Sequence, residues 1–201
     1  MFKHPFWSAP RRAPWLAPCL AHLLAVGLLF SSGWAQAQRV RLATSAGDVV
    51  LELDREKAPK TVDNFVAYVK AGHYDGTIFH RVIAGFMVQG GGYKADLSEK
   101  NVRAAIPLES GNGLNNLRGT VAMARTNVPD SATAQFFINV VDNPFLDKAN
   151  SRDGLGYAVF GKVVDGMDVV DQIRAVPTRA AGMHGNLPEK AITIRKATLE
   201  K

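Results

Sequence analysis

Apolar and polar residues alternate in two short segments that begin just after residue 37. The apolar positions are Val40 and Leu42 in the first segment and Val49, Leu51 and Leu53 in the second. Successive side chains of a strand point to opposite faces, so this alternation indicates two strands with one buried face each. The turn-forming residues 45–48 (Ser-Ala-Gly-Asp) stand between them. The pattern therefore predicts a β-hairpin.

The period changes from two to that of a helix in residues 57–76, KAPKTVDNFVAYVKAGHYDG. Apolar residues recur there at i, i+3, i+4 and i+7, which is one face of an amphipathic helix. They are Val62, Phe65, Val66 and Val69. We expect Thr61 to cap this helix and Gly72 to end it.

Residues 77–164 return to short strand-like segments divided by Gly, Asn and Pro-Asp turns. A second helix is predicted from Met167 to Ala175, with Val170 and Ile173 facing inward and Pro177 after its end. The tail AITIRKATL (191–199) alternates again and predicts a closing strand. Many short strands with two helices favour an antiparallel barrel or sandwich, since a parallel α/β sheet needs a helix between most strands.

Residues 1–37 have the features of a secretory signal peptide. Basic residues (Lys3, Arg11 and Arg12) precede an apolar run of eleven residues, 20–30, and Ala35-Gln36-Ala37 supplies small residues for a peptidase. Cleavage is expected after Ala37. A membrane anchor is disfavoured because about 20 apolar residues are needed to span a bilayer. The expected organisation is a cleaved leader (1–37) and one domain (38–201), exported to a bacterial periplasm or secreted beyond the cell.

Removal of the leader changes the composition of the domain. Three of the 24 basic residues and none of the 18 acidic ones lie in the leader, which leaves 21 against 18 and a net charge of +3 instead of +6. No cluster of Lys and Arg remains that would indicate nucleic-acid binding. The single cysteine and all three tryptophans also lie in the leader, so the domain is expected to fold without disulfides.

The segment FHRVIAGFMVQGG (79–91) places an arginine and a glutamine among large apolar residues, without a nucleophile or a carboxylate pair. If Phe86 to Gln89 is a strand, Met87 and Gln89 share one face, and Phe86 and Val88 point the other way. The same alternation in QFFINV (135–140) places Gln135 beside Phe137. Two strands would thus each offer an apolar side chain and an amide. Such a surface suits an apolar ring and a peptide backbone, and Arg81 would add a permanent charge with five donors.

These segments resemble the cyclophilin family. Together with FHRVIAGFMVQGG, the blocks GTVAMAR (119–125), SATAQFFI (131–138) and YAVFGKVVDGMDVV (157–170) stand in cyclophilin order and spacing, over nearly all of residues 38–201. The resemblance is greatest to the bacterial periplasmic members. It implies peptidyl-prolyl cis-trans isomerase activity, a mainly β fold and a closed eight-stranded antiparallel β-barrel capped by two α-helices.

The resemblance also implies roles for individual residues. Arg81 matches the catalytic arginine. The family's proline pocket is matched by Phe86, Met87, Phe137 and Leu146, and its polar contacts by Gln89 and Gln135. Ala124 and Arg125 match the segment whose backbone holds the substrate.

Three substrate-contacting positions depart from the residues that are common in the family. Phe145 stands where many eukaryotic members have Trp, which implies weak cyclosporin binding with activity retained. Tyr157 replaces a common His and bears on pocket shape. Arg125 replaces a common Asn.

The remaining histidines and apolar residues have structural interpretations. His80 would point away from Arg81 on an alternating strand and is expected to be a structural residue satisfied by hydrogen bonds. His73 and His184 lack ligand spacing, so no metal site is expected. Strand residues expected in the core are Phe136, Ile138, Val159 and Phe160.

Two functional classes remain open. The first is an enzyme, without cofactor, that accelerates X-Pro isomerisation in exported, unfolded or partly folded polypeptides. The second is a chaperone-like module that binds proline-containing segments with little turnover. Neither hypothesis involves nucleic acid or a stable membrane association after leader cleavage, and the family implies a monomer.

Overall fold

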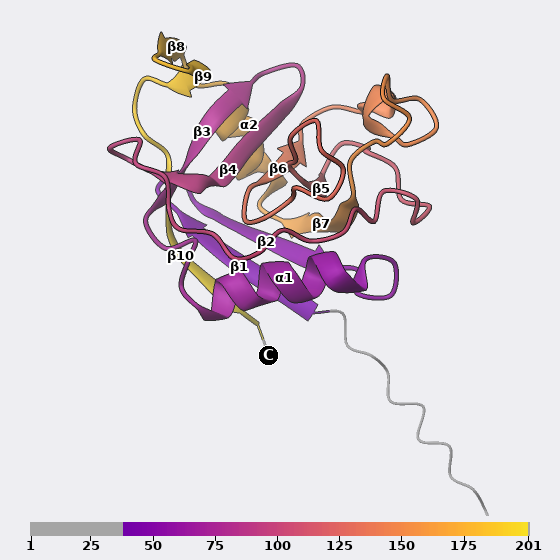
Figure 1. Ribbon diagram of the computed structural model, residues 1–201. Helices are drawn as coiled ribbons and strands as arrows, with labels where there is room; N and C mark the ends of the chain where they lie inside the picture. The colour runs from indigo at the N-terminus through magenta and orange to yellow at the C-terminus, as the bar shows by residue number, and fades with distance from the viewer. Residues whose placement is uncertain (1–37, 201) are drawn as a thin grey trace, which may run out of the picture. The chain divides into compact units, whose positions relative to one another are not determined.

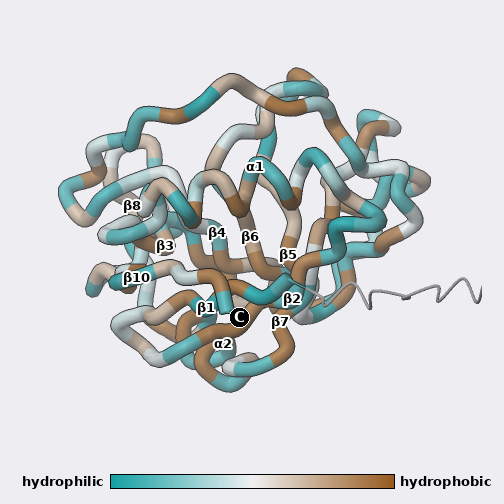
Figure 2. The backbone as a smooth tube through the Cα atoms, turned by 90° about the horizontal axis from the view of Figure 1, so that it is seen from below, coloured by the Kyte–Doolittle hydropathy of each residue, from teal (hydrophilic) through white to brown (hydrophobic). Residues whose placement is uncertain are grey.

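The structure of the protein is a computed structural model that describes residues 38–200 (Figure 1). Eight strands form a closed antiparallel barrel in the order β1-β10-β3-β4-β6-β5-β7-β2. Their bounds are β1 Gln38–Thr44, β2 Asp48–Leu53, β3 Thr77–Ile83, β4 Met87–Lys94, β5 Thr120–Met123, β6 Phe136–Asn139, β7 Val159–Asp165 and β10 Thr193–Leu199. Two helices, α1 (Pro59–Lys70) and α2 (Met167–Arg174), lie at opposite ends of the barrel (Figures 1 and 2). The predicted fold class is confirmed.

The first hairpin forms as the alternation predicted. β1 pairs with β2 so that Val40 faces Leu51 and Leu42 faces Val49. These four side chains are fully buried. The signal-peptide prediction falls on residues 1–37, which lie outside the described part of the chain.

The start of α1 differs from the prediction. The helix begins at Pro59, with Ala58 as N-cap and no side-chain cap, so Thr61 lies within the first turn. Glu109 takes the capping role from 48 residues away: its carboxylate accepts hydrogen bonds from the backbone N–H of Lys60 (3.2 Å) and Thr61 (2.8 Å), and from the Thr61 hydroxyl (2.7 Å). The open N–H groups of a first turn can be satisfied by any acceptor that the fold brings there. Gly72 follows the helix end in a left-handed conformation (φ 65°).

The barrel interior is an apolar core that both helices close. From α1, Val62 and Phe65 enter it, and from α2, Val170 and Ile173. The Phe65 ring lies 5.4 Å from that of Phe136, edge to face. Hydrophobic residues gather on the strands at the middle of the molecule in Figure 2, with hydrophilic residues on the surrounding loops. Burial of these side chains is the main stabilising contribution, about 1.5–3 kcal/mol for each large residue.

A second, two-stranded sheet follows α2 and was not predicted. β8 (Thr178–Ala181) pairs with β9 (His184–Pro188) and leaves the barrel closed without them. This hairpin lies next to β3 (Figure 1). Among the described residues, no helix has the length and hydropathy required to cross a membrane.

Candidate functional site

The strand register brings the candidate residues into one row across the barrel wall. Arg81 on β3 is opposite Gln89 on β4, and Gln89 is opposite Phe137 on β6. Phe137 faces Ala122 on β5, and Ala122 faces Val159 on β7. Residues directly opposite in paired strands share a face of the sheet, so the row lies on one face.

This face is the outside of the barrel. Phe136 and Ile138, the neighbours of Phe137 along β6, both belong to the interior core. Phe137 therefore points outward. It belongs to a second apolar cluster, called here the outer cluster. Its buried members are Met87, Ala122, Phe137, Leu146 and Val159, and its partly buried members are Ile83, Phe86, Leu114, Ala124 and Tyr157.

The Arg81 side chain is exposed at the edge of the outer cluster. Its Nη1 lies 3.9 Å from Met87 Sδ and 3.4 Å from Gln89 Oε1. The guanidinium carbon is 5.7 Å from the centroid of the Phe86 ring, which is within cation–π range. Within residues 38–200, Arg81 forms no ion pair with a carboxylate. Its charge and most of its donors are therefore available to a bound molecule.

Two glutamines extend the polar side of this face. Gln89 Nε2 donates to Gln135 Oε1 at 2.9 Å. Gln135 is held close to the backbone of β4, because a Cβ added to Gly92 would lie 2.7 Å from Gln135 Cγ. Linked amides that still have free donor and acceptor capacity suit a peptide backbone.

Phe86 differs from its predicted place. β4 begins at Met87, so Phe86 precedes the strand and does not follow its alternation. It packs on the outer cluster and not on the opposite face. Its ring lies 5.5 Å from that of Phe145, which is 55% exposed. Val159, expected in the core, also belongs to the outer cluster, because it alternates with Phe160, which lies in the interior core, and it pairs with Ala122.

Tyr157 and Arg125 lie at the end of the outer cluster that is away from Arg81 in strand order. The Tyr157 ring packs edge to face on Phe137, with centroids 5.7 Å apart. The Arg125 guanidinium carbon lies over the Tyr157 ring, 4.7 Å from its centroid. Ala124, the preceding residue, donates its backbone N–H to Gln135 O at 2.9 Å.

His80 is buried, as expected of a structural residue, but its hydrogen bonding is less complete than expected. Its Nδ1 has no hydrogen-bond partner among the described residues. The ring instead packs against Tyr93 (4.7 Å between centroids) and His184 (5.7 Å). Burial, with smaller contributions from the charges of His184 and Arg81, lowers the pKa of His80 from 6.5 to about 4.

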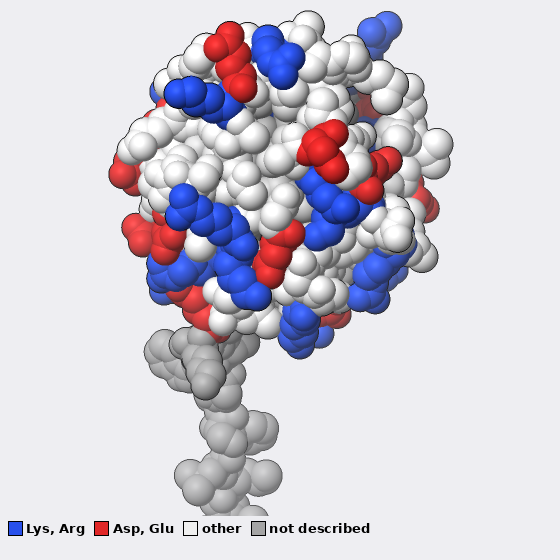
Figure 3. Space-filling view, turned by 90° about the vertical axis from the view of Figure 1, so that its left-hand side faces the viewer, with Lys and Arg blue, Asp and Glu red and all other residues white. Residues whose placement is uncertain are grey.

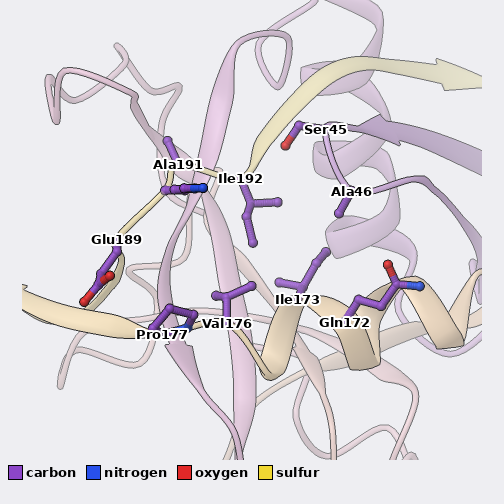
Figure 4. Close-up of a pocket in the computed structure, with 10 residues that line it drawn as sticks. Ser45, Ala46, Gln172, Ile173, Val176, Pro177, Glu189, Ala191 and Ile192 are labelled. Carbon is purple, nitrogen blue, oxygen red and sulfur yellow. The ribbon is translucent and has the colours of Figure 1, made fainter.

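The described part of the chain, residues 38–200, also has features outside the outer cluster. Among residues 38–200, no three His, Cys, Asp or Glu side chains come together as metal ligands. On the face shown in Figure 3, basic and acidic side chains are intermingled. A hollow of about 430 Å³ lies between α2, the β1–β2 turn and the start of β10, with Ile173, Val176 and Ile192 pointing into it (Figure 4). None of the candidate residues lines it.

All the candidate residues thus lie in the outer cluster or in contact with it, and their roles remain predictions. Sequence reasoning missed Ala122, Ile83 and Leu114. Ala122 could have been found, because it stands two residues before Ala124 on the same side of the GTVAMAR segment. Leu114 comes from a loop without periodicity, so the sequence carried no signal for it.

Comparison with known proteins agrees with this geometry. Residues 39–199 match the family described as cyclophilin type peptidyl-prolyl cis-trans isomerase/CLD. The chain is 57% identical to peptidyl-prolyl cis-trans isomerase A of Dickeya dadantii, over 81% of this chain and 84% of that protein. It is 52% identical to peptidyl-prolyl cis-trans isomerase B of Escherichia coli, over 81% of this chain and 99% of that protein.

Solved structures of cyclophilin-type isomerases are also similar to this chain. A cyclophilin type peptidyl-prolyl cis-trans isomerase of Cryptosporidium parvum superposes with a TM-score of 0.68 at 28% identity, covering 82% of this chain and 98% of that one. A second structure of that protein, determined in the presence of the dipeptide Ala-Pro, has a TM-score of 0.67 and 28% identity and covers 82% of this chain and 99% of that one. The barrel, the outward-facing row of residues and the family match lead to one conclusion: the chain belongs to the cyclophilin-type peptidyl-prolyl cis-trans isomerases.

Proposed function

We propose that this isomerase accelerates rotation about X-Pro bonds in polypeptides that have crossed a membrane, and that it does so without covalent chemistry. In this proposal the outer cluster receives the proline ring, and Arg81 stabilises the twisted amide. Gln89, Gln135 and the backbone at Ala124 and Arg125 hold the flanking chain. The observation that carries the proposal is the position of Arg81, a guanidinium without a carboxylate partner in residues 38–200, beside Phe86 and Met87.

The reaction explains why the site needs no nucleophile, base or metal. The C–N bond of a peptide has partial double-bond character, and rotation about it meets a barrier of about 18–20 kcal/mol. In the twisted transition state the lone pair returns to the prolyl nitrogen, and the group is less dipolar than the planar amide. An apolar surface therefore opposes the twist less than water does. A guanidinium aimed at that nitrogen donates a hydrogen bond that exists only when the amide is twisted, which is differential binding of the transition state.

Magnitudes show that Arg81 acts together with its surroundings. A ~10⁴-fold acceleration requires that the activation free energy be lowered by about 5.5 kcal/mol. A hydrogen bond to a charged group contributes about 1.5–3 kcal/mol. The rest of the barrier reduction is assigned to hydrogen bonds that hold the flanking peptide backbone and to the apolar surface of Met87, Phe137 and Leu146.

The relatives support the ligand class. The Cryptosporidium protein, whose barrel superposes on this one, was crystallised with a dipeptide that ends in proline. The apolar and amide side chains of the row from Arg81 to Phe137 support the same class of ligand for this chain, a peptide with an X-Pro bond. Phe145 in place of the common Trp supports weak cyclosporin binding, because its ring is mostly exposed and held on one side by Phe86.

The signal-peptide pattern of residues 1–37 supports export to the periplasm. Cleavage after Ala37 would leave all the described residues, 38–200, in the mature chain. The mature protein would then act on exported polypeptides in the periplasm, as a monomer and without bound cofactor. Mass spectrometry of the protein purified from the periplasmic fraction tests this, and a chain that retains residues 1–37 would contradict it.

The isomerase proposal is tested with residues 38–201 in a protease-coupled assay on a peptide with an X-Pro bond. Arg81→Ala should lower kcat/KM at least about tenfold, because the transition-state hydrogen bond is lost. Arg195→Ala removes another exposed strand arginine, on β10, and should leave turnover unchanged. Thermal unfolding should show both variants folded. Near-normal turnover of Arg81→Ala would remove the arginine from the mechanism.

The same assay separates the rival function. A binding module would hold the peptide, measured by titration calorimetry, without shortening the slow phase that arises from the cis isomer. That result for the unsubstituted protein would favour the chaperone hypothesis over the enzyme.

A further inference from the structure

The Arg125 side chain is almost entirely buried although it lies next to a candidate substrate-holding segment. Only 2% of it is exposed. A buried guanidinium requires partners for its donors. Arg125 finds them within the protein: Nε donates to Gly156 O at 2.8 Å, Nη1 to Thr126 O at 2.9 Å, and Nη2 to the carboxylate of Asp153. Its charge is thus directed away from a bound peptide.

These partners join Arg125 to the loop that carries Tyr157. Asp153 accepts hydrogen bonds from the backbone N–H of Leu155 (3.0 Å) and Gly156 (3.3 Å), so the carboxylate that holds Arg125 also shapes the loop. The hydrogen bond from Arg125, followed by those from this backbone, keeps the pKa of Asp153 far below its ordinary value. Asp153 is therefore ionised at neutral pH and can pair with the Arg125 guanidinium.

The loop is tight at the residue before Tyr157. Gly156 has a left-handed conformation (φ 66°), and a Cβ added there would lie 2.6 Å from Lys148 N and 2.8 Å from Leu146 O. Tyr157 donates its backbone N–H to Leu146 O at 2.9 Å. The backbone is thus fixed on one side of the ring, and the Arg125 guanidinium lies over its face. The ring edge meets Phe137 of the outer cluster.

We propose that Arg125 is a positioning residue, which acts on substrate affinity by holding the Tyr157 ring against Phe137 as the fixed end wall of the proline-binding surface. Arg125 itself touches no substrate with its side chain. This inference rests on the assignment of Tyr157 and Phe137 to that surface. The Asn that is common at this position in the family has a shorter side chain without the fork of donors by which Arg125 contacts Asp153, Gly156 and the ring.

Loss of the Arg125 contacts with Asp153 and Tyr157 should weaken substrate binding and leave the rate of isomerisation of the bound peptide unchanged. A wall against the proline ring contacts the planar and the twisted amide alike, and loss of such uniform binding raises KM while kcat is retained. Arg125→Leu should therefore raise KM about fivefold with kcat within about twofold, the opposite of the kcat loss expected for Arg81→Ala. Arg125→Lys, which keeps the charge but not the fork of donors, should give an intermediate KM.

The matched control is Arg118. It also forms a two-pronged ion pair, with Asp171 (3.1 and 2.7 Å), and donates to a carbonyl, Val140 O, at 3.0 Å. Its partner lies on α2, away from Tyr157. Arg118→Leu should lower the thermal unfolding temperature and leave KM unchanged.

A double-substitution cycle gives the decisive readout. If Arg125 acts through Tyr157, then adding Arg125→Leu to a Tyr157→Ala protein should cause no further rise in KM. Independent, multiplying effects of the two substitutions would overturn the proposal, as would an unchanged KM in folded Arg125→Leu. Should Arg125→Leu fail to fold, Asp153→Asn removes the charged partner and leaves the arginine in place. It should raise KM in the same direction, and an unchanged KM would again overturn the proposal. A normal kcat in Arg81→Ala would refute the mechanism proposed above without affecting this result.

Discussion

His80 makes the stability of the fold depend on pH in a defined direction. The ring is buried against Tyr93 and His184, and its Nδ1 has no partner among the described residues. Burial above all lowers its pKa from 6.5 to about 4, so the folded protein holds it neutral at pH 5–7. The unfolded chain exposes it to water, where its pKa is about 6.5.

The sign and the size of the effect follow from these two values. Between pH 6.5 and pH 4 the unfolded state binds more protons than the folded state, so the free energy of unfolding rises with pH across this window. The contribution of the buried His80 ring to the free energy of unfolding is fully present above pH 6.5 and is lost as the pH falls to about 4. Each unit of pKa difference corresponds to about 1.4 kcal/mol, which gives a total of about 3 kcal/mol and about 2 kcal/mol between pH 7 and pH 4.5.

The measurement is urea unfolding of residues 38–201 at pH 7.0 and pH 4.5, for the unsubstituted protein and for His80→Gln. Burial also lowers the pKa of His73, so both proteins should lose stability on acidification. The free energy of unfolding of the unsubstituted protein should fall by about 2 kcal/mol more than that of His80→Gln, because only the unsubstituted protein contains the His80 ring. Equal losses in the two proteins would refute the reasoning and show that the folded structure accommodates a charged ring at this position.

Three further results are expected. Gly92→Ala should displace Gln135, whose Cγ lies 2.7 Å from the new methyl position, and the lost hydrogen bond from Gln89 should lower kcat/KM about fivefold; full activity would show that Gln135 has room to move. Phe65→Ala should lower the free energy of unfolding by about 3–5 kcal/mol in urea titration, because Phe65 packs within 5.0–5.4 Å of three core rings; a loss below about 1 kcal/mol would contradict its central place. The mature protein should show tyrosine emission only, and indole emission would mean that a residue such as Trp34 is retained.

Periodicity predicted those elements of the fold whose partners are close in sequence or whose faces are strongly apolar. The first hairpin, both helices and the last strand belong to this group. The β8–β9 hairpin does not, because residues 178–188 are interrupted by two glycines, Gly182 and Gly185, and by Pro188, and show no alternation. These strands pair with each other while lying next to β3.

The same distinction applies to the site. Met87, Gln89, Gln135 and Phe137 lie on the faces that alternation assigned to them, since they belong to regular ladders or border them directly. Phe86 does not, because it precedes its strand. Val159 was expected in the core together with its neighbour Phe160, but consecutive strand residues point to opposite faces and only Phe160 lies inside. The capping of α1 by Glu109 and the burial of Arg125 depend on contacts across 48 and 28 residues. Local sequence carries no information on such contacts.

The barrel wall carries two apolar clusters that share strands but not side chains, one inside and one outside. Substitutions at outward positions can therefore accumulate without opening voids beneath the helices. Selection for new client polypeptides and selection for a folded domain act on separate sets of residues in the same strands. Relatives that keep the reaction should retain the outward row, and their differences in client polypeptide should arise in the loops that border it, while the inward row stays similar in volume.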